Sequence, residues 1–280
     1  MDETYDIFIR HRLKMFDEWM HSLEYKNLCS MFLDAAENLV RIGKCHVPCC
    51  AELESGAVAR TEIATGSGLH RGFYCPSLTE DIVVGNVHRG RLLKRLSPKR
   101  KWYFVYGFDR DDKLILSQMY YNGKLAEEEH LFYDGDRVYG VTQSPDGGLI
   151  RVASETYLDG EIMCYERAEI SPWDEKCKCF KMYREEYIYV SDHLKVCYRH
   201  DYSPASDFNG LPWLEEAMWK DLSFGESCLK DALAIGIHRK TRYTFDWHED
   251  CMTGYLAEHV IGANDEIVTG SGYYSINKPR

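Results

Sequence analysis

Turn signals at nearly even spacing between Lys101 and Ile170 constrain this chain more than any other feature. Each combines an aromatic residue, then Asp, Asn or Gly, then a charged and an aliphatic residue, at 108–114, 121–125, 133–138 and 157–162, with a further Pro-Asp-Gly-Gly turn at 145–148. Asn-Gly and Asp-Gly tolerate the positive φ that two-residue hairpin turns require. The signals recur about every 12 residues, the interval typical of consecutive hairpins. The stretch therefore predicts an antiparallel β-meander.

The segments between these turns predict strands that are rich in aromatic and β-branched residues. The expected strands of the meander are 102–108, 113–121, 124–133, 137–143, 149–158 and 161–170. Further strands are expected at 180–190, 194–202, 242–247 and 254–260. We expect the 113–121 and 124–133 strands to pair as a hairpin, with Asn122-Gly123 at the turn.

Helical periodicity flanks the meander on both sides. Apolar residues recur at helical spacing over 5–23 and again over 27–42, where Gly43 fits a helix C-terminus. The pattern is lost between Cys45 and Gly72. Beyond a turn-rich stretch, helices are predicted at 211–219 and 226–238.

These patterns predict an α+β fold in which a long antiparallel β-meander sheet packs with N-terminal helices and a C-terminal helical segment. The expected division is an N-terminal helical segment at 1–60, the meander at 61–205 and a C-terminal α/β segment at 206–280. We expect the three to form one compact unit.

Charge and cysteine usage limit the classes of partner and compartment. The formal net charge is -11, which argues against nucleic-acid binding and favours a basic partner. A basic run at 88–101 is interpreted as a solvated helix or loop. No signal peptide and no apolar run long enough to span a membrane is apparent, and the 11 cysteines are an odd number. The expectation is a cytoplasmic protein with reduced thiols and no membrane partner.

Two groups of residues could carry chemistry. Cys45, Cys49 and Cys50 surround a histidine, but their spacing does not match a zinc knuckle, so buried structural thiols are the preferred interpretation. His248 and Cys251 could act as base and nucleophile if folding brought them together. We interpret that segment as an ordinary polar turn. No catalytic residue, cofactor or metal is therefore expected.

Acids and tyrosines gather on the meander. Glu127 and Glu129 alternate on one strand and could serve a glycosidase or bind a cation, although a solvated sheet face is the simpler interpretation. Tyrosine beside charge is typical of a protein-binding surface. The residues predicted to bind a partner are Glu127, Glu129, Tyr133, Asp134, Asp136, Tyr157, Asp159 and Glu161.

The repeated unit of Tyr, Asp or Asn, Gly, a charged and an aliphatic residue resembles the YD-type repeats of Rhs and related bacterial polymorphic toxins. It is also similar to hairpin meanders in cytosolic immunity proteins encoded beside such toxins. The chain lacks a long repeat array and a cleavage motif, so the similarity to an immunity protein is the better one. The resemblance implies a non-catalytic inhibitor that occludes the active site of one cognate, basic toxin. The alternatives are a thiol- or metal-dependent hydrolase and a structural module of a secretion or phage assembly.

Overall fold

The computed structural model describes residues 14–15, 18–54, 57–65, 69–83, 89–170, 179–190, 193–203, 236–248 and 251–275. Its contacts divide the chain into two units. The meander unit comprises Ala36–Cys179, and the terminal unit combines Met1–Ala35 with Phe180–Arg280.

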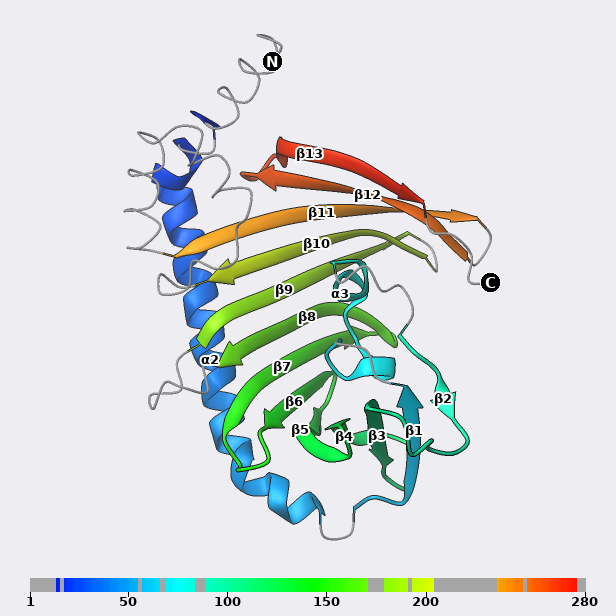
Figure 1. Cartoon of the computed structure of the whole chain (residues 1–280). Coiled ribbons are helices and arrows are strands. Elements are labelled where there is room, and N and C mark those ends of the chain that lie inside the picture. Colours follow the sequence, from blue (N-terminus) through cyan, green and yellow to red (C-terminus); the bar gives the residue numbers. More distant parts are fainter. Residues whose placement is uncertain are drawn as a thin grey trace. The chain divides into compact units, whose positions relative to one another are not determined.

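The meander unit contains the six strands that the turn signals predict. They are β3 (Trp102–Phe108), β4 (Leu114–Tyr121), β5 (Lys124–Asp134), β6 (Arg137–Gln143), β7 (Leu149–Leu158) and β8 (Glu161–Ile170). Each pairs antiparallel with the next, as Figure 1 shows, so the predicted meander is confirmed. Two short strands, β1 (Arg60–Thr65) and β2 (Leu92–Leu93), extend the sheet beyond β3 in the order β2-β1-β3.

The hairpin turns have the backbone that their residues favour. Asn122 and Gly123 adopt φ values of 50° and 75° between the paired residues Tyr121 and Lys124. Asp159 and Gly160, between β7 and β8, adopt 53° and 87°. Positive φ at both central positions is the geometry that matches strand twist in a two-residue hairpin. The predicted hairpin at Asn122-Gly123 is therefore confirmed.

Helix α2 (Leu23–Glu54) packs on one face of the meander through its residues from Ala36 onward. The ring of His46 lies 4.5 Å from that of Phe132 on β5. A Cβ added to Gly43 would lie only 2.3 Å from Cγ2 of Val152 on β7, so glycine permits a close approach of helix and sheet.

The predictions for this helix need correction. The helix does not end at Gly43 but continues through Pro48 to Glu54. Gly43 packs closely against the sheet, and tertiary contacts of this kind routinely override a local helix-end signal. The expected loss of pattern between Cys45 and Gly72 is also wrong, since residues 45–54 are helical and β1 follows.

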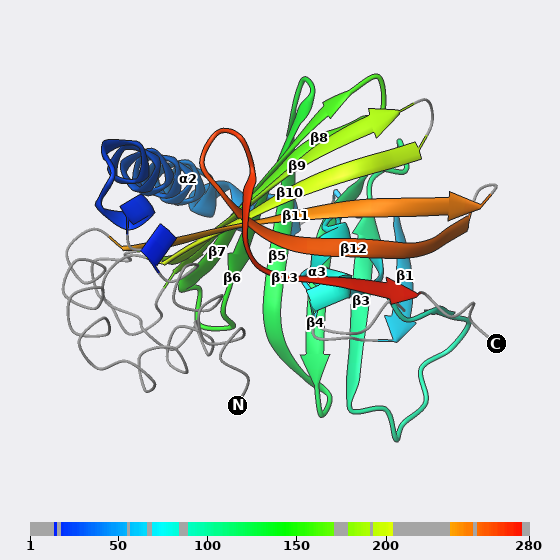
Figure 2. The same ribbon diagram turned by 90° about the horizontal axis from the view of Figure 1, so that it is seen from above.

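The opposite face of the meander is covered by the segment between β1 and β2. This segment contains the 3-10 turn η1 (Gly72–Tyr74) and the short helix α3 (Leu78–Val83), which is labelled in Figure 2. A buried cluster on this face comprises Ala64, Phe104, Tyr106 and Phe108. The hydroxyl of Tyr106 donates to Arg71 O at 2.8 Å and accepts from Phe73 N at 2.9 Å, which fixes the covering segment to the sheet.

The terminal unit is a second run of consecutive antiparallel strands. They are β9 (Cys179–Val190), β10 (His193–Ser203), β11 (Ile237–His248), β12 (Cys251–Ile261) and β13 (Glu266–Ser275). The expected strands 180–190, 194–202, 242–247 and 254–260 are confirmed, while β13 was not anticipated. The first residues of α2 pack on this sheet, where the Phe32 ring lies 5.2 Å from that of His200 and 4.9 Å from that of His238.

The described part of the chain is mostly antiparallel β-sheet with few helices, and thus richer in strands than the expected α+β fold. The helices predicted at 211–219 and 226–238 lie outside the described residues, except for Ile237 and His238, which begin β11. Of the helix predicted at 5–23, only residues 14–15 and 18–22 are described. No described helix has both the length and the apolar character that a membrane span needs.

Candidate functional site

Two neighbouring hairpin turns bring most of the predicted binding residues together. The β5–β6 and β7–β8 turns lie at the same end of the meander, because β6 runs antiparallel to both β5 and β7. The backbone N–H of Tyr157 donates to Asp136 O at 2.8 Å and links the two turns. Four exposed acids decorate them: Asp134, Asp136, Asp159 and Glu161.

Two large side chains lie exposed among these acids. Leu158 is 58% exposed and Tyr133 is 41% exposed, although Tyr133 is held in place because its hydroxyl donates to Leu114 O at 2.8 Å. The ammonium of Lys113 lies 5.1 Å from the centre of the Tyr133 ring. We call these six residues the turn patch: Tyr133, Asp134, Asp136, Leu158, Asp159 and Glu161.

The other three predicted binding residues are Glu127, Glu129 and Tyr157, and the prediction needs correction for Glu129. Glu129 is only 3% exposed, so it cannot meet a partner. Glu127 pairs with Arg151 at 3.0 Å, and the Tyr157 hydroxyl donates to Glu155 at 2.6 Å. The physical reason is the period of two along a strand, which places Glu127 and Glu129 on the face covered by the β1–β2 segment.

Arg71 is the centre of a buried ion network on that inner face. Its Nε and Nη2 donate to the two oxygens of Glu129, each at 2.9 Å, and its Nη1 bonds Glu155. The three side chains are at most 4% exposed. Burial alone would raise the pKa of Glu129, but the nearby charges of Arg71 and His70 hold this pKa well below its usual range.

His70 extends the network in a defined tautomer. Its Nε2 lies 3.1 Å from Glu129 Oε1, and its Nδ1 lies 2.7 Å from the Tyr165 hydroxyl. Burial lowers the pKa of His70, so the ring is neutral near pH 7. A neutral ring that donates from Nε2 to the carboxylate must accept from Tyr165 at Nδ1, and the network assigns this tautomer.

Two further arginines continue the network along the same face. Arg151 donates to Glu169 at 3.0 Å as well as to Glu127. Arg167 bonds both oxygens of Glu80 on α3 at 2.8 Å, and its Nε lies 3.0 Å from Glu169. These pairs join β5, β7 and β8 to one another and to α3 of the covering segment.

The cysteines and the histidine that could carry chemistry lie on α2 and in the β11–β12 hairpin. Cys45 and Cys49 are exposed on α2, whereas Cys50 is buried, so the expectation of buried thiols is wrong for the first two. His248 and Cys251 are opposite each other in the β11–β12 hairpin. Among the described residues, no group of three or more His, Cys, Asp or Glu side chains could hold a metal ion.

The basic run is partly used within the fold. Arg89 donates through Nη2 to Ser77 O at 3.2 Å and through Nη1 to Cys75 O. Lys94, Lys99 and Lys101 are exposed, as expected of a solvated segment.

Comparisons with known proteins leave the family open. No family model and no curated protein matches this chain. Among solved structures, a porin-like protein from Bacteroides uniformis aligns with 78% of this chain and 94% of its own, at 9% sequence identity and a TM-score of 0.24.

Proposed function

We propose that this chain is a non-enzymatic binding protein that recognises a basic protein through the turn patch. The observation that supports this most is the grouping of four exposed carboxylates around two exposed side chains, Tyr133 and Leu158, on adjacent turns. Aromatic and aliphatic anchors within a polar rim are the usual anatomy of a protein interface.

The turn patch is built on a rigid support. Its two turns are tight hairpins joined by the Tyr157–Asp136 backbone bond. Behind it, Glu155 on β7 accepts bonds from both Tyr157 and the buried Arg71. A surface fixed before binding loses less conformational entropy when a partner docks. The buried network therefore favours the turn patch as a preformed recognition surface.

Charge and apolar contact would contribute to different rates. Exposed acids steer a basic partner toward the patch and raise the association rate, and this effect weakens as salt screens the charges. Leu158 and Tyr133 would lose water on contact and would therefore slow dissociation.

The most specific form of this proposal is an immunity protein that occludes the active site of a cognate toxin. Its support is the acidic balance of the chain, with a net charge of -11, together with the sequence resemblance of the meander. Toxins that act on nucleic acids need basic clefts, and an acidic surface is complementary to such a cleft.

A charge reversal with a matched control tests the binding surface. The partner is first captured on the immobilised chain, identified and purified. Asp136→Lys/Glu161→Lys alters two acids of the turn patch, while Asp159, whose φ of 53° suits aspartate, is left in place. Asp34→Lys/Glu37→Lys makes the same change in net charge on exposed positions of α2.

The association rate at low salt should fall about tenfold for the turn variant and change little for the helix variant. Equal rates for the two variants would show that the turn patch is not the interface. The immunity role has its own test, because co-expression of the chain should restore growth to cells that produce the captured partner. The unchanged chain and the helix variant should restore growth, and the turn variant should not. A captured partner that does not harm the cells would contradict the toxin assignment.

A further inference from the structure

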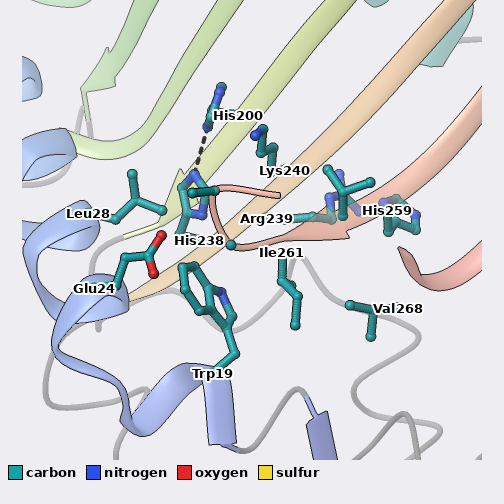
Figure 3. A pocket seen from close by; sticks show the side chains of 13 residues that line it. Trp19, Glu24, Leu28, His200, His238, Arg239, Lys240, His259, Ile261 and Val268 are labelled. Atoms are coloured by element: carbon teal, nitrogen blue, oxygen red, sulfur yellow. Dashed lines mark hydrogen bonds between the residues drawn. The ribbon is translucent and has the colours of Figure 1, made fainter. Parts of the chain in front are cut away.

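The meander unit carries a group of cations that are not neutralised by carboxylates of the described chain. Elsewhere such pairing is common, as beside the pocket of the terminal unit that Figure 3 shows, which Arg239 and Lys240 line. Arg239 Nη2 donates to Asp201 at 3.1 Å. Lys240 Nζ donates to Asp265 at 2.5 Å. The exposed cations at 99–101, by contrast, form no ion pair with any described residue, so they are available to an anionic partner.

Folding places two exposed aromatic rings beside these cations. Trp102 begins β3 directly after them, and Tyr121 lies opposite it on β4, with ring centres 4.4 Å apart. Trp102 is 44% exposed and Tyr121 43%. Lys124 lies opposite Tyr121, so its side chain is on the same face of the sheet. We call these six residues the basic patch: Lys99, Arg100, Lys101, Trp102, Tyr121 and Lys124.

Backbone hydrogen bonds fix the basic patch. Asn122 N donates to Lys101 O at 2.7 Å, which joins the β4–β5 turn to the segment before β3. Arg100 N donates to Ser97 O at 3.0 Å within that segment. Residues 89–101 contain no acid, so the charge before the two rings is positive throughout. The basic patch is therefore a preformed surface, which loses less conformational entropy on contact.

The basic patch and the turn patch lie at opposite ends of the meander. Strand β5 begins at Lys124 in the basic patch and ends at Asp134 in the turn patch. Its 11 residues span about 35 Å at roughly 3.3 Å per residue. This is several times the Debye length of about 8 Å at physiological salt, so each patch acts on its own surroundings despite the acidic net charge. One copy of the chain cannot bring its own two patches together.

The two patches are complementary in charge and in apolar surface. The turn patch has four exposed acids around Tyr133 and Leu158, and these acids also form no ion pair with any described residue. The basic patch has four exposed cations around Trp102 and Tyr121. Opposite charges around apolar anchors favour association and fix its orientation. A second copy of this chain therefore presents a surface that fits the basic patch.

We infer that copies of this chain associate head to tail, with the basic patch of one copy against the turn patch of the next. Two different surfaces meet in this contact, so it can extend beyond a dimer into a ring or an open chain of copies. Six residues a side are far fewer than the roughly 20–30 of a stable interface, so the Kd is on the order of 10–100 µM.

Self-association competes with recognition of a basic protein, because both use the turn patch. The inference shares this surface with the proposed function but needs no partner protein, so either can fail without the other. A monomeric chain whose turn patch binds the captured partner would overturn the inference alone. Head-to-tail association of a chain whose turn patch does not bind the partner would overturn the proposed function alone.

Sedimentation velocity of the full chain at increasing concentration tests the inference. At about 0.15 M ionic strength the mean sedimentation coefficient should rise with concentration, and about 1 M salt should suppress the rise. Lys101→Glu/Lys124→Glu, the end variant, reverses two charges of the basic patch. The end variant and the turn variant should each sediment as a monomer, whereas the helix variant should associate like the unchanged chain.

A mixture of the end variant and the turn variant provides the most specific readout. The turn variant keeps the basic patch and the end variant keeps the turn patch, so together they restore an intact contact. The mixture should therefore associate although neither variant does so alone. Both variants keep a negative net charge, so general attraction between them cannot explain that result.

The aromatic pair and the position of the contact have their own tests. Trp102→Ala should weaken self-association about tenfold, because it removes an apolar anchor. Tyr274→Ala is the control, since Tyr274 in the terminal unit is 53% exposed and its ring also packs on a second ring, that of Tyr255, at 5.0 Å. A photo-reactive phenylalanine analogue in place of Tyr121 should cross-link to 133–137 or 157–162 of a second, isotope-labelled copy.

Several results would overturn the inference. They are sedimentation as a monomer at every concentration up to about 1 mM, a mixture of the two variants that does not associate, or cross-links confined to segments outside the two turns. A monomeric chain that binds oligothymidylate through Lys101 and Lys124 would assign the basic patch to a nucleic acid and would overturn it as well.

Discussion

Replacement of Arg71 by Met should destabilise the meander unit more than any surface substitution. Arg71→Met keeps an unbranched side chain at a position whose φ is 57°, so the backbone strain is similar for both residues. What changes is charge. The variant leaves Glu129 and Glu155 buried, each about 4% exposed, without the guanidinium that bonds both.

The magnitude follows from what remains. Removal of one partner from a buried ion pair costs about 3–5 kcal/mol of the free energy of unfolding. Two carboxylates lose their counter-ion here, but His70 still bonds Glu129 and Tyr157 still donates to Glu155. We therefore expect a loss of about 4 kcal/mol, a large fraction of the roughly 5–15 kcal/mol that a domain has.

Hydrogen exchange in increasing urea, followed at the amides of β5, β6 and β7, measures this loss within the meander unit. The triple variant Arg71→Met/Glu129→Gln/Glu155→Gln should recover much of it, because the remaining amides stay hydrogen-bonded without charge. Arg60→Met removes an arginine of an exposed pair and should change these amides little. A loss below about 1 kcal/mol for Arg71→Met would refute the account of the network, since that is the range of exposed pairs.

Three further predictions concern pH and packing. The terminal unit should lose stability as pH falls from about 6.5 to about 3. Burial lowers the pKa of His200 to about 3 in the folded chain, so over this range the imidazole takes up a proton in the unfolded chain only. Protection of the β10 and β11 amides from hydrogen exchange that does not change over this range would contradict the prediction. The Glu129 contribution should be complete above about pH 4.5 and should be lost only as pH falls further toward its lowered folded pKa, a dependence that Glu129→Gln should remove from the β5 amides. Gly43→Ala should cost about 1–3 kcal/mol, because the new Cβ would collide with Val152, and urea unfolding should show recovery when Val152→Ala is added.

Local turn chemistry made the meander predictable. Asn-Gly and Asp-Gly pairs favour positive φ, and Asn122-Gly123 and Asp159-Gly160 adopt it. The positions of such turns in the sequence therefore predict the strands between them. β1 escaped prediction because it pairs with β3 across a long connection without a tight turn. Gly43 misled for a similar reason, since its role is set by Val152 more than 100 residues away and not by its neighbours.

In the candidate site too, the residues placed by local turns were predictable and those placed by distant contacts were not. The acids in turns, such as Asp134 and Asp159, are exposed because turns lie on the surface, and this much was predictable. Which strand face would be covered was not, because the covering segment is neither strand nor long helix. Arg71 had no local signal at all, as its partners Glu129 and Glu155 lie 58 and 84 residues away.

The turn patch can be tested most directly by its protection from exchange in the complex. Hydrogen–deuterium exchange of the full chain, alone and saturated with the captured partner, would map the contact residue by residue. We predict that protection gathers at 133–137 and 157–162, with little change in the helical residues around Asp34 and Glu37. Protection confined to α2 or to β9–β13, with the two turns exchanging as in the free chain, would contradict the proposed binding surface.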